Sequence, residues 1–342
     1  MRRKTRRAED GRLRVEDRGG TIAGRAIVLV VALGCASFSA AQPLEKVRVG
    51  MPSFSLSFVA PKVAQAKGFF RAEGLEVELI QMATNVTVVA LTTKDIDYST
   101  ASGAVLRSAV RGLPVKVLMY FNDRPLHVLV TKRDVSGVGE LRGRIVGFAG
   151  YGDTTEYMLR AMLRKANMEL EKDVKALAVS GSGPRLTALL TGKVDAAILP
   201  PPYNFEAETK GFKQLMAAAD VFEAGTSGLG VVLDKLKDNP AQVRRMIRAL
   251  LRTQSFMKEN KNESVRVISE WLKLEPTVAA ASYDLYVRGL SPDGLVGEKT
   301  LQIDIDRARE SLKIKDEVPL NRVVDFGILN EVLKERAALR SR

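Results

Sequence analysis

Strand-like runs alternate with helix-like runs from about residue 47 onward, and this alternation limits the possible folds more than any other feature. The strand-like runs are rich in Val, Ile, Leu and Tyr, and they span residues 47–51, 75–82, 96–101 and 115–121. Helical patterns at 56–70, 85–93 and 102–112 separate them. Strands separated by helices predict a parallel sheet with crossover helices. The predicted fold class is therefore α/β.

The pattern starts again after residue 143, which predicts a second sheet. Its strand-like runs are 144–149, 174–180 and 195–200, helical patterns lie at 154–166 and 184–191, and 212–219 begins a further strand or a helix. The rest is helical, at 240–258, 263–272, 276–290 and 301–313. A chain of this length exceeds what one core usually supports, so we expect two doubly wound lobes.

The lobe boundaries follow from two strand-like segments that we expect to cross between the lobes, HVLVTK at 127–132 and GLGVVLDKL at 228–236. The first lobe is predicted to be discontinuous and to carry the C-terminal helices. It comprises residues 42–132 and 226–342, and the second lobe comprises residues 133–225.

The amino terminus has the layout of a secretory signal peptide. Basic residues lead into the uncharged run AIVLVVALGCASFSAAQ from Ala26, and Ser39 and Ala41 are small residues placed for cleavage after Ala41. We therefore expect a signal peptide over residues 1–41 and a periplasmic protein beginning at Gln42. Two alternatives remain: a retained membrane anchor, although the apolar run is short for a bilayer, and a lipoprotein modified at Cys35.

Charge and the rarity of two residue types exclude several functions. The net charge is +13, but the first 25 residues hold nine basic and four acidic side chains, and the later charges are interspersed. A mixed-sign surface gives no case for nucleic-acid binding. The chain has one His and one Cys, and that Cys lies in the predicted signal peptide. We therefore expect no metal site with nitrogen or sulfur ligands and no cofactor.

Several segments resemble, in order, the sulfonate/nitrate/thiamine-precursor class of ABC-transporter substrate-binding proteins, and the resemblance extends from Val47 to about Arg288. They include AQAKGFFRAEGLEVELI, LTTKDIDYSTAS, LRGRIVGFAGYGDTTEYMLRAML and RLTALLTGKVDAAILPPPY. The resemblance implies a type II periplasmic-binding-protein fold, two α/β lobes joined by two crossing strands with the ligand between them. It further implies a monomer, a small-molecule ligand, and an ABC permease with its ATPase as partner.

The predicted ligand-binding residues follow the strands, because open parallel sheets bind ligands at the carboxyl ends of their strands. In the first lobe they are Ser53, Phe54, Ser55, Asn85, Thr100 and Ser102. In the second lobe they are Tyr151, Thr154, Thr155, Pro202 and Tyr203. Asp95, Asp97 and Asp195 precede or begin buried strands, and we expect them to cap strands rather than bind ligand.

Three further assignments stay open. Asp153 stands three residues before Glu156, so it either completes a capping box or contacts a ligand. Phe54, Tyr151 and Tyr203 either stack on a planar ligand or pack in the core. His127 is either a packing or hinge residue or a ligand contact. Trp271 lies in an amphipathic helical pattern, which favours the core.

The function that this predicts is capture of a sulfonate, carboxylate, aromatic or pyrimidine-like molecule for an ABC importer, with no catalytic residue. One alternative is an enzyme, since thiamine-pyrimidine synthases share the fold family, although they use histidine and a cysteine-rich motif that the mature chain lacks. The other is a receptor that presents its ligand to a sensor kinase.

Overall fold

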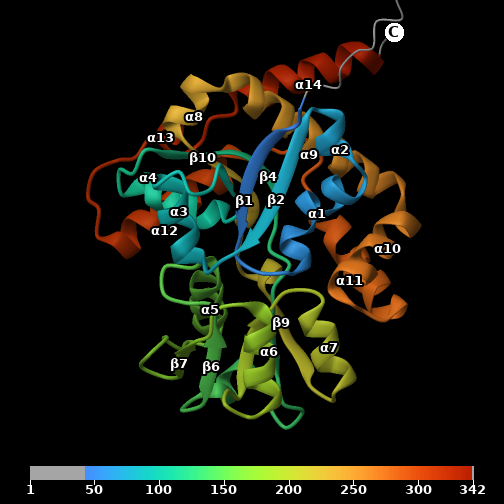
Figure 1. Ribbon diagram of the computed structural model, residues 1–342. Coiled ribbons are helices and arrows are strands. Elements are labelled where there is room, and N and C mark those ends of the chain that lie inside the picture. The colour runs from blue at the N-terminus through green and yellow to red at the C-terminus, as the bar shows by residue number, and fades with distance from the viewer. Residues whose placement is uncertain (1–42, 341–342) are drawn as a thin grey trace, which may run out of the picture. The chain divides into compact units, whose positions relative to one another are not determined.

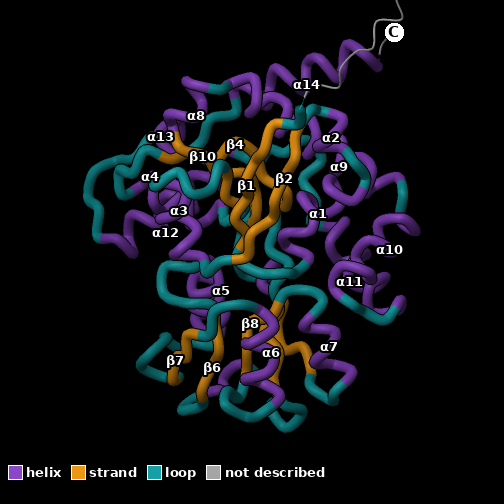
Figure 2. Tube along the Cα trace, viewed as in Figure 1, coloured by secondary structure: helices purple, strands orange, loops and turns teal. Residues whose placement is uncertain are grey.

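A computed structural model describes residues 43–340, which form two five-stranded sheets, each with helices packed on it (Figures 1 and 2). The predicted signal peptide and Cys35 lie outside the described residues. Among the helices that the structure describes, none combines the length and the apolar character that a bilayer crossing requires.

The first sheet has the strand order β2-β1-β3-β10-β4. Its strands are β1 (Glu45–Met51), β2 (Leu75–Gln81), β3 (Tyr98–Ser99), β4 (Val115–Asn122) and β10 (Ser227–Val232). Strand β1 runs parallel to β2 and β3, whereas β10 runs antiparallel to β3 and β4. The sequence predicted all five, but β10 ends earlier than expected, because the chain turns into the short helix α8 (Leu233–Asp238).

Two apolar cores cover the two faces of this sheet. Helices α1 (Val59–Ala66), α2 (Phe69–Ala72), α9 (Pro240–Glu259) and α14 (Gly327–Arg340) supply one core, and α3 (Thr84–Thr92), α4 (Ser102–Val110), α12 (Glu298–Leu312) and α13 (Leu320–Val323) supply the other (Figure 1). The single helix expected over 56–70 is in fact the short turn η1 (Leu56–Phe58) followed by α1 and α2. Gly68 separates α1 from α2 because its φ of 70° is left-handed.

The second sheet has the strand order β7-β6-β8-β5-β9. Its strands are β5 (Val128–Thr131), β6 (Ile145–Phe148), β7 (Lys175–Ala178), β8 (Ala196–Leu199) and β9 (Lys213–Ala217). The segment 127–132 was expected to close the first lobe, but β5 pairs antiparallel with β8 and β9 instead. The change of sheet therefore falls between Asn122 and Val128. All four β5 residues are buried. A strand of this kind is compatible with the interior of either sheet, so tertiary contacts decide which sheet it joins.

The remaining helices complete the two lobes. Around the second sheet they are η2 (Val138–Leu141), α5 (Thr154–Lys165), α6 (Ser182–Leu190), α7 (Tyr203–Thr209) and η3 (Ala218–Asp220). Helices α10 (Lys261–Leu272) and α11 (Pro276–Arg288) pack with α1 and η1 in a separate apolar cluster. The sequence reasoning missed α7, α8, α13 and α14, three of which have seven residues or fewer.

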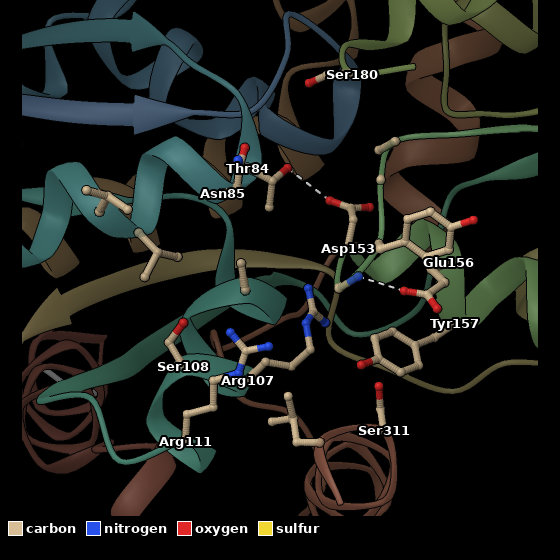
Figure 3. Close-up of a pocket in the computed structure, with 18 of the residues that line it drawn as sticks. Thr84, Asn85, Arg107, Ser108, Arg111, Asp153, Glu156, Tyr157, Ser180 and Ser311 are labelled. Atoms are coloured by element: carbon tan, nitrogen blue, oxygen red, sulfur yellow. Dashed lines mark hydrogen bonds between the residues drawn. The ribbon is translucent and has the colours of Figure 1, made fainter. Parts of the chain in front are cut away.

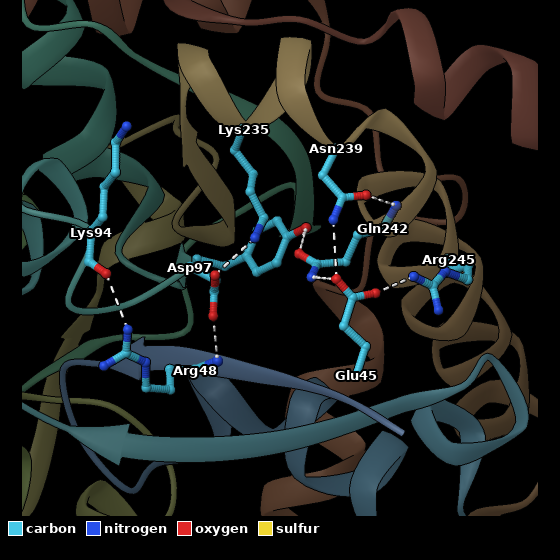
Figure 4. Close-up of polar contacts among 9 residues, drawn as sticks. Glu45, Arg48, Lys94, Asp97, Lys235, Asn239, Gln242 and Arg245 are labelled. Atoms are coloured by element: carbon cyan, nitrogen blue, oxygen red, sulfur yellow. Dashed lines mark hydrogen bonds and ion pairs between the residues drawn. The ribbon is translucent and has the colours of Figure 1, made fainter. Parts of the chain in front are cut away.

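Acidic side chains fasten strand ends in both sheets, as expected for Asp97 and Asp195. Asp97 accepts a hydrogen bond from the backbone N–H of Arg48 at 2.8 Å and another from Lys235 (Figure 4). Asp195 accepts one from the backbone N–H of Ile145 at 2.9 Å. Each aspartate therefore ties the start of one strand to its neighbour, and neither side chain is left for a ligand.

A second polar cluster in Figure 4 joins the start of β1 to helix α9. Glu45 accepts hydrogen bonds from Asn239, Gln242 and Arg245, and Gln242 accepts one from the Tyr98 hydroxyl at 3.0 Å. This cluster lies at the amino end of β1, opposite the carboxyl end that leads into the loop at residues 52–55. We assign it a structural role.

Candidate functional site

The loops that follow the strands of both sheets meet, and they are directly hydrogen bonded. The backbone N–H of Leu56 donates to the carbonyl of Pro201 at 3.0 Å, and the Tyr203 hydroxyl donates to the carbonyl of Phe54 at 2.7 Å. A second bridge runs from the Thr84 hydroxyl to the Asp153 carboxylate at 2.9 Å. The structure is therefore that of two lobes in contact rather than held apart.

Several cavities lie along this contact among the described residues, and two of them adjoin each other. A small one of about 50 Å³ is lined from the first lobe by residues such as Ser53 and Thr226, and from the second by residues such as Thr155 and Arg185. A larger one of about 750 Å³ lies beside it, between helices α3, α4 and α12 of the first lobe and α5 of the second (Figure 3). Asp153 lines both, so they are two parts of one interlobe region.

Asp153 caps helix α5 and bridges the lobes at the same time. Its carboxylate accepts from the backbone N–H and the hydroxyl of Thr155, both at 2.8 Å, and from Thr84. Burial acts to raise the pKa of Asp153, but the nearby Arg107 charge and these hydrogen bonds outweigh it and lower that pKa. Glu156 completes the capping by accepting from the backbone N–H of Gly152 at 2.6 Å. Of the two alternatives for Asp153, the geometry therefore gives capping.

Arg185 is a buried cation at the small cavity, with only 2% of its surface exposed. Its guanidinium donates to the carbonyls of Ile198 at 2.6 Å and Val179 at 3.1 Å, and its contact with Ser182 is longer, at 3.4 Å. Burial lowers the pKa of Arg185 to about 10, which still leaves it charged at neutral pH. The sequence reasoning missed this residue because arginine is seldom buried.

His127 also lines the small cavity, and its Nδ1 is buried without a hydrogen-bond partner among the described residues. Burial and the Arg185 charge lower the pKa of His127 to about 4. The imidazole is therefore neutral at physiological pH. A neutral ring nitrogen without a partner can donate to a bound molecule or accept from one, so the ligand contact that the sequence left open for His127 stays a prediction.

Acidification is expected to destabilise the protein through His127. Its ordinary pKa is about 6.5, so between pH 7 and 5 the unfolded chain takes up a proton that folded His127, with its pKa of about 4, does not. That difference should remove about 1.5 to 2 kcal/mol of unfolding free energy. Buried Asp304, whose pKa is raised to about 7, acts in the opposite direction over this range. The measurement is therefore urea denaturation at both pH values, with wild type compared against His127→Asn. An equal pH dependence in both proteins would contradict the assignment.

The structure brings some predicted site residues to the cavities. Asn85 and Tyr151 line the larger one, and Ser53, Thr154 and Thr155 line the smaller one. Phe54 and Tyr203 instead form the contact between the lobes, and Pro202 precedes Tyr203 there. Ser55, Thr100 and Ser102 are buried nearby and line neither cavity. Their roles in binding stay predictions.

The aromatic residues therefore do not share one cavity. The exposed Tyr151 ring packs edge-on against Phe148 with centroids 5.0 Å apart, while Phe54 packs against Trp271 at 5.7 Å. Trp271 is partly buried at the edge of its apolar cluster. The sequence reasoning also missed Arg107 and Arg111, which lie one helical turn apart on α4 and line the larger cavity. Their spacing of four residues places both on one helix face, and this was the signal in the sequence that could have found them.

Metal binding has no support in the part of the chain that the structure describes, since no three His, Cys, Asp or Glu side chains gather there.

The fold is that of periplasmic binding proteins. The chain matches the periplasmic aliphatic sulphonate binding protein SsuA from Escherichia coli with a TM-score of 0.63 and 17% identity, over 82% of this chain and 92% of that one. The desulfurization enzyme DSZB matches with a TM-score of 0.63 and 14% identity, over 85% and 99%. One fold therefore carries binding proteins and an enzyme, so function must be argued from the site.

Sequence comparison identifies the family. The family described as NMT1/THI5 like matches residues 57–264, and this chain belongs to that family. The class that the sequence resembled, and its fold, are thereby confirmed. A relative in Chloroflexus aurantiacus, the riboflavin-binding protein RibY, is 31% identical over 235 residues, which are 66% of this chain and 66% of the relative.

Proposed function

We propose that this protein is an extracytoplasmic solute-binding protein, which encloses a small organic molecule between its lobes and delivers it to an ABC permease with its ATPase. The proposal includes export through a signal peptide over residues 1–41. The observation that carries it is the pair of adjoining cavities, lined from both lobes at the carboxyl ends of the strands. Sites of this kind bind ligands in open α/β sheets.

Unpartnered polar groups at the contact support a ligand there. Nδ1 of His127 and Nη2 of Arg107 are buried without hydrogen-bond partners among the described residues. Leaving such groups unsatisfied costs free energy, and a ligand that supplies partners would recover it. The names of the relatives and structural neighbours, which include riboflavin-binding and sulphonate-binding proteins, support the same class of function.

Binding without catalysis is the second part of the proposal. Asp153 and Glu156, the carboxylates that line the larger cavity, are both engaged in hydrogen bonds within the protein. His127 is the only histidine in the sequence, and it sits at the small cavity. Among the described residues that line the two cavities, no free carboxylate is left to act with His127 as an acid and base pair.

A thermal-shift screen is expected to reveal the ligand class. Riboflavin, alkanesulfonates, nitrate, pyrimidines and aromatic carboxylates should be tested on the protein beginning at Gln42. A ligand present at 100 times its dissociation constant should add about 2.7 kcal/mol to the free energy of unfolding. Solution scattering at saturation should show a smaller radius of gyration than without ligand if the lobes close on it. Chemical conversion of the bound compound during incubation would contradict the proposal.

A further inference from the structure

Helix α4 presents two arginines to the larger cavity from one face. Arg107 lies in the last turns of the helix and Arg111 is its C-terminal cap, so they are four residues apart. Figure 3 shows both side chains extending into the cavity. Like charges at this spacing repel each other. A pair placed this way is stabilised by an anion that contacts both.

Among the described residues no carboxylate forms a hydrogen bond or ion pair with Arg107, although the charges of Asp153, Asp304 and Glu156 act on it. The Arg107 side chain is only 9% exposed, its Nη2 has no hydrogen-bond partner among the described residues, and its Nη1 reaches only the Thr154 hydroxyl, at 3.5 Å. The guanidinium lies over the Tyr157 ring, 5.2 Å from the centroid. Tyr157 provides a packing surface, but it does not supply the acceptor that Nη2 lacks.

The two carboxylates that line this cavity are committed to other donors. Asp153 accepts from Thr155 and Thr84, and Glu156 accepts from the backbone N–H of Gly152 and from Arg160. Burial lowers the pKa of Arg107, whereas the charge of Asp153 favours the charged form of Arg107. No hydrogen bond joins the two residues in the structure.

Three exposed apolar or aromatic side chains also line this cavity. Val89 is 60% exposed, Leu113 is 37% exposed and Tyr151 is 59% exposed, and all three line it. Large apolar side chains that line a cavity favour a ligand with an apolar surface of its own. A volume of about 750 Å³ is also far more than an inorganic anion would fill.

We infer that the larger cavity takes an organic acid, with its carboxylate, sulfonate or phosphate group on Arg107 and Arg111 and its apolar or aromatic body against Val89, Leu113 and Tyr151. This inference rests on the proposed function and names the chemical class of the ligand. Arg111 also lies at the C-terminal end of α4, where a cation stabilises the helix without any ligand. A test must therefore measure affinity separately from stability.

The test uses matched probes that differ only in charge. Naphthalene-2-carboxylate, naphthalene-2-sulfonate and 2-naphthyl phosphate are compared with naphthalene-2-carboxamide and naphthalene-2-sulfonamide by calorimetric titration. The proteins are wild type, Arg111→Gln, Arg107→Met and the control Arg71→Gln, which removes an exposed arginine of α2 outside the cavity. Arg111→Gln is the main variant, because exposed Arg111 can be replaced without opening a core cavity, whereas buried Arg107 cannot.

At least one acid is expected to bind wild type tenfold or more tightly than its neutral counterpart. Arg111→Gln should weaken the binding of that acid by ten- to about a hundredfold, the range for hydrogen bonds to a charged group. The affinities of the neutral probes should stay unchanged. Arg71→Gln should change neither. The strongest of the three acids identifies the acidic group.

Either of two results with the probes would overturn the inference while leaving a solute-binding protein in place: neutral probes that bind as tightly as the acids, or an acid whose affinity Arg111→Gln does not alter. If the naphthalene probes fail but riboflavin or another neutral compound of the wider screen binds, the acid assignment is likewise wrong. If no compound in either set binds, the inference and the proposed function both fail.

Discussion

Replacing Gly103 is expected to weaken ligand binding by ten- to about a hundredfold through a steric block to lobe closure. Gly103 lies at the start of α4 in the first lobe, and a Cβ placed there would lie 2.3 Å from the Thr154 hydroxyl of the second lobe. Overpacking of this kind costs about 1 to 3 kcal/mol. The cost arises only when the lobes meet, so the ligand-free protein should lose less than about 1 kcal/mol of stability.

A double-mutant cycle isolates this clash. Without the Thr154 hydroxyl, the nearest atom of that residue to the new Cβ is its own Cβ at 3.6 Å, an ordinary contact. Gly103→Ala should therefore weaken binding in wild type and have no effect on affinity in a Thr154→Ala background. Gly103→Leu should weaken binding in both. The control is Gly139→Leu, where no atom lies near the added Cβ.

Titration of the best compound from the screen provides the affinities, and solution scattering reports whether Gly103→Leu stays extended at saturation. If Gly103→Leu binds as tightly as wild type, the contact between Gly103 and Thr154 does not form in the ligand-bound protein. The closure mechanism would then be wrong.

Replacing Arg185 with methionine is expected to lower the free energy of unfolding by about 2 to 5 kcal/mol, since two carbonyls would each lose a charged donor. Methionine keeps much of the volume, so the loss measures the guanidinium contacts with Val179 and Ile198 rather than a large cavity. Arg185→Lys should have an unfolding free energy between those of wild type and Arg185→Met, because an ammonium lacks the planar fork that reaches both carbonyls.

Urea denaturation measures these free energies. The matched control is Arg164→Met on the exposed face of α5, where a change within about 0.5 kcal/mol is expected. A loss below about 1 kcal/mol for Arg185→Met would show that solvent satisfies the two carbonyls when the side chain is shortened. The structural role assigned to the Arg185 guanidinium would then be wrong.

Parts of the site could be predicted because they depend on residues close together in the chain. Asp153 and Glu156 form a capping arrangement that needs only residues 152–156. The alternation in β2 was equally local: Leu75 and Val77 are buried, while Glu76 and Glu78 are exposed. Such patterns follow from backbone geometry within one element, so they can be predicted from the local sequence.

The meeting of the lobes could not be predicted in the same way. Phe54 and Tyr203 were both expected in a ligand-lining role, yet their hydrogen bond to each other joins residues 149 positions apart. Arginine is usually exposed, yet Arg107 and Arg185 are buried. Their burial depends on the elements that pack over them. No local pattern marks a cation whose partners come from another element.

By itself, the sequence determined the α/β class, nearly all the strands, the family resemblance and the strand ends at which a site should lie, because each of these rests on short-range spacing. Tertiary structure alone decided that β5 joins the second sheet, that Arg107 and Arg111 share a cavity with Asp153, and that Phe54 and Tyr203 join the lobes. Those outcomes depend on burial and pairing summed over residues far apart in the chain. Many pairings satisfy an apolar strand such as β5, and only the whole fold selects one.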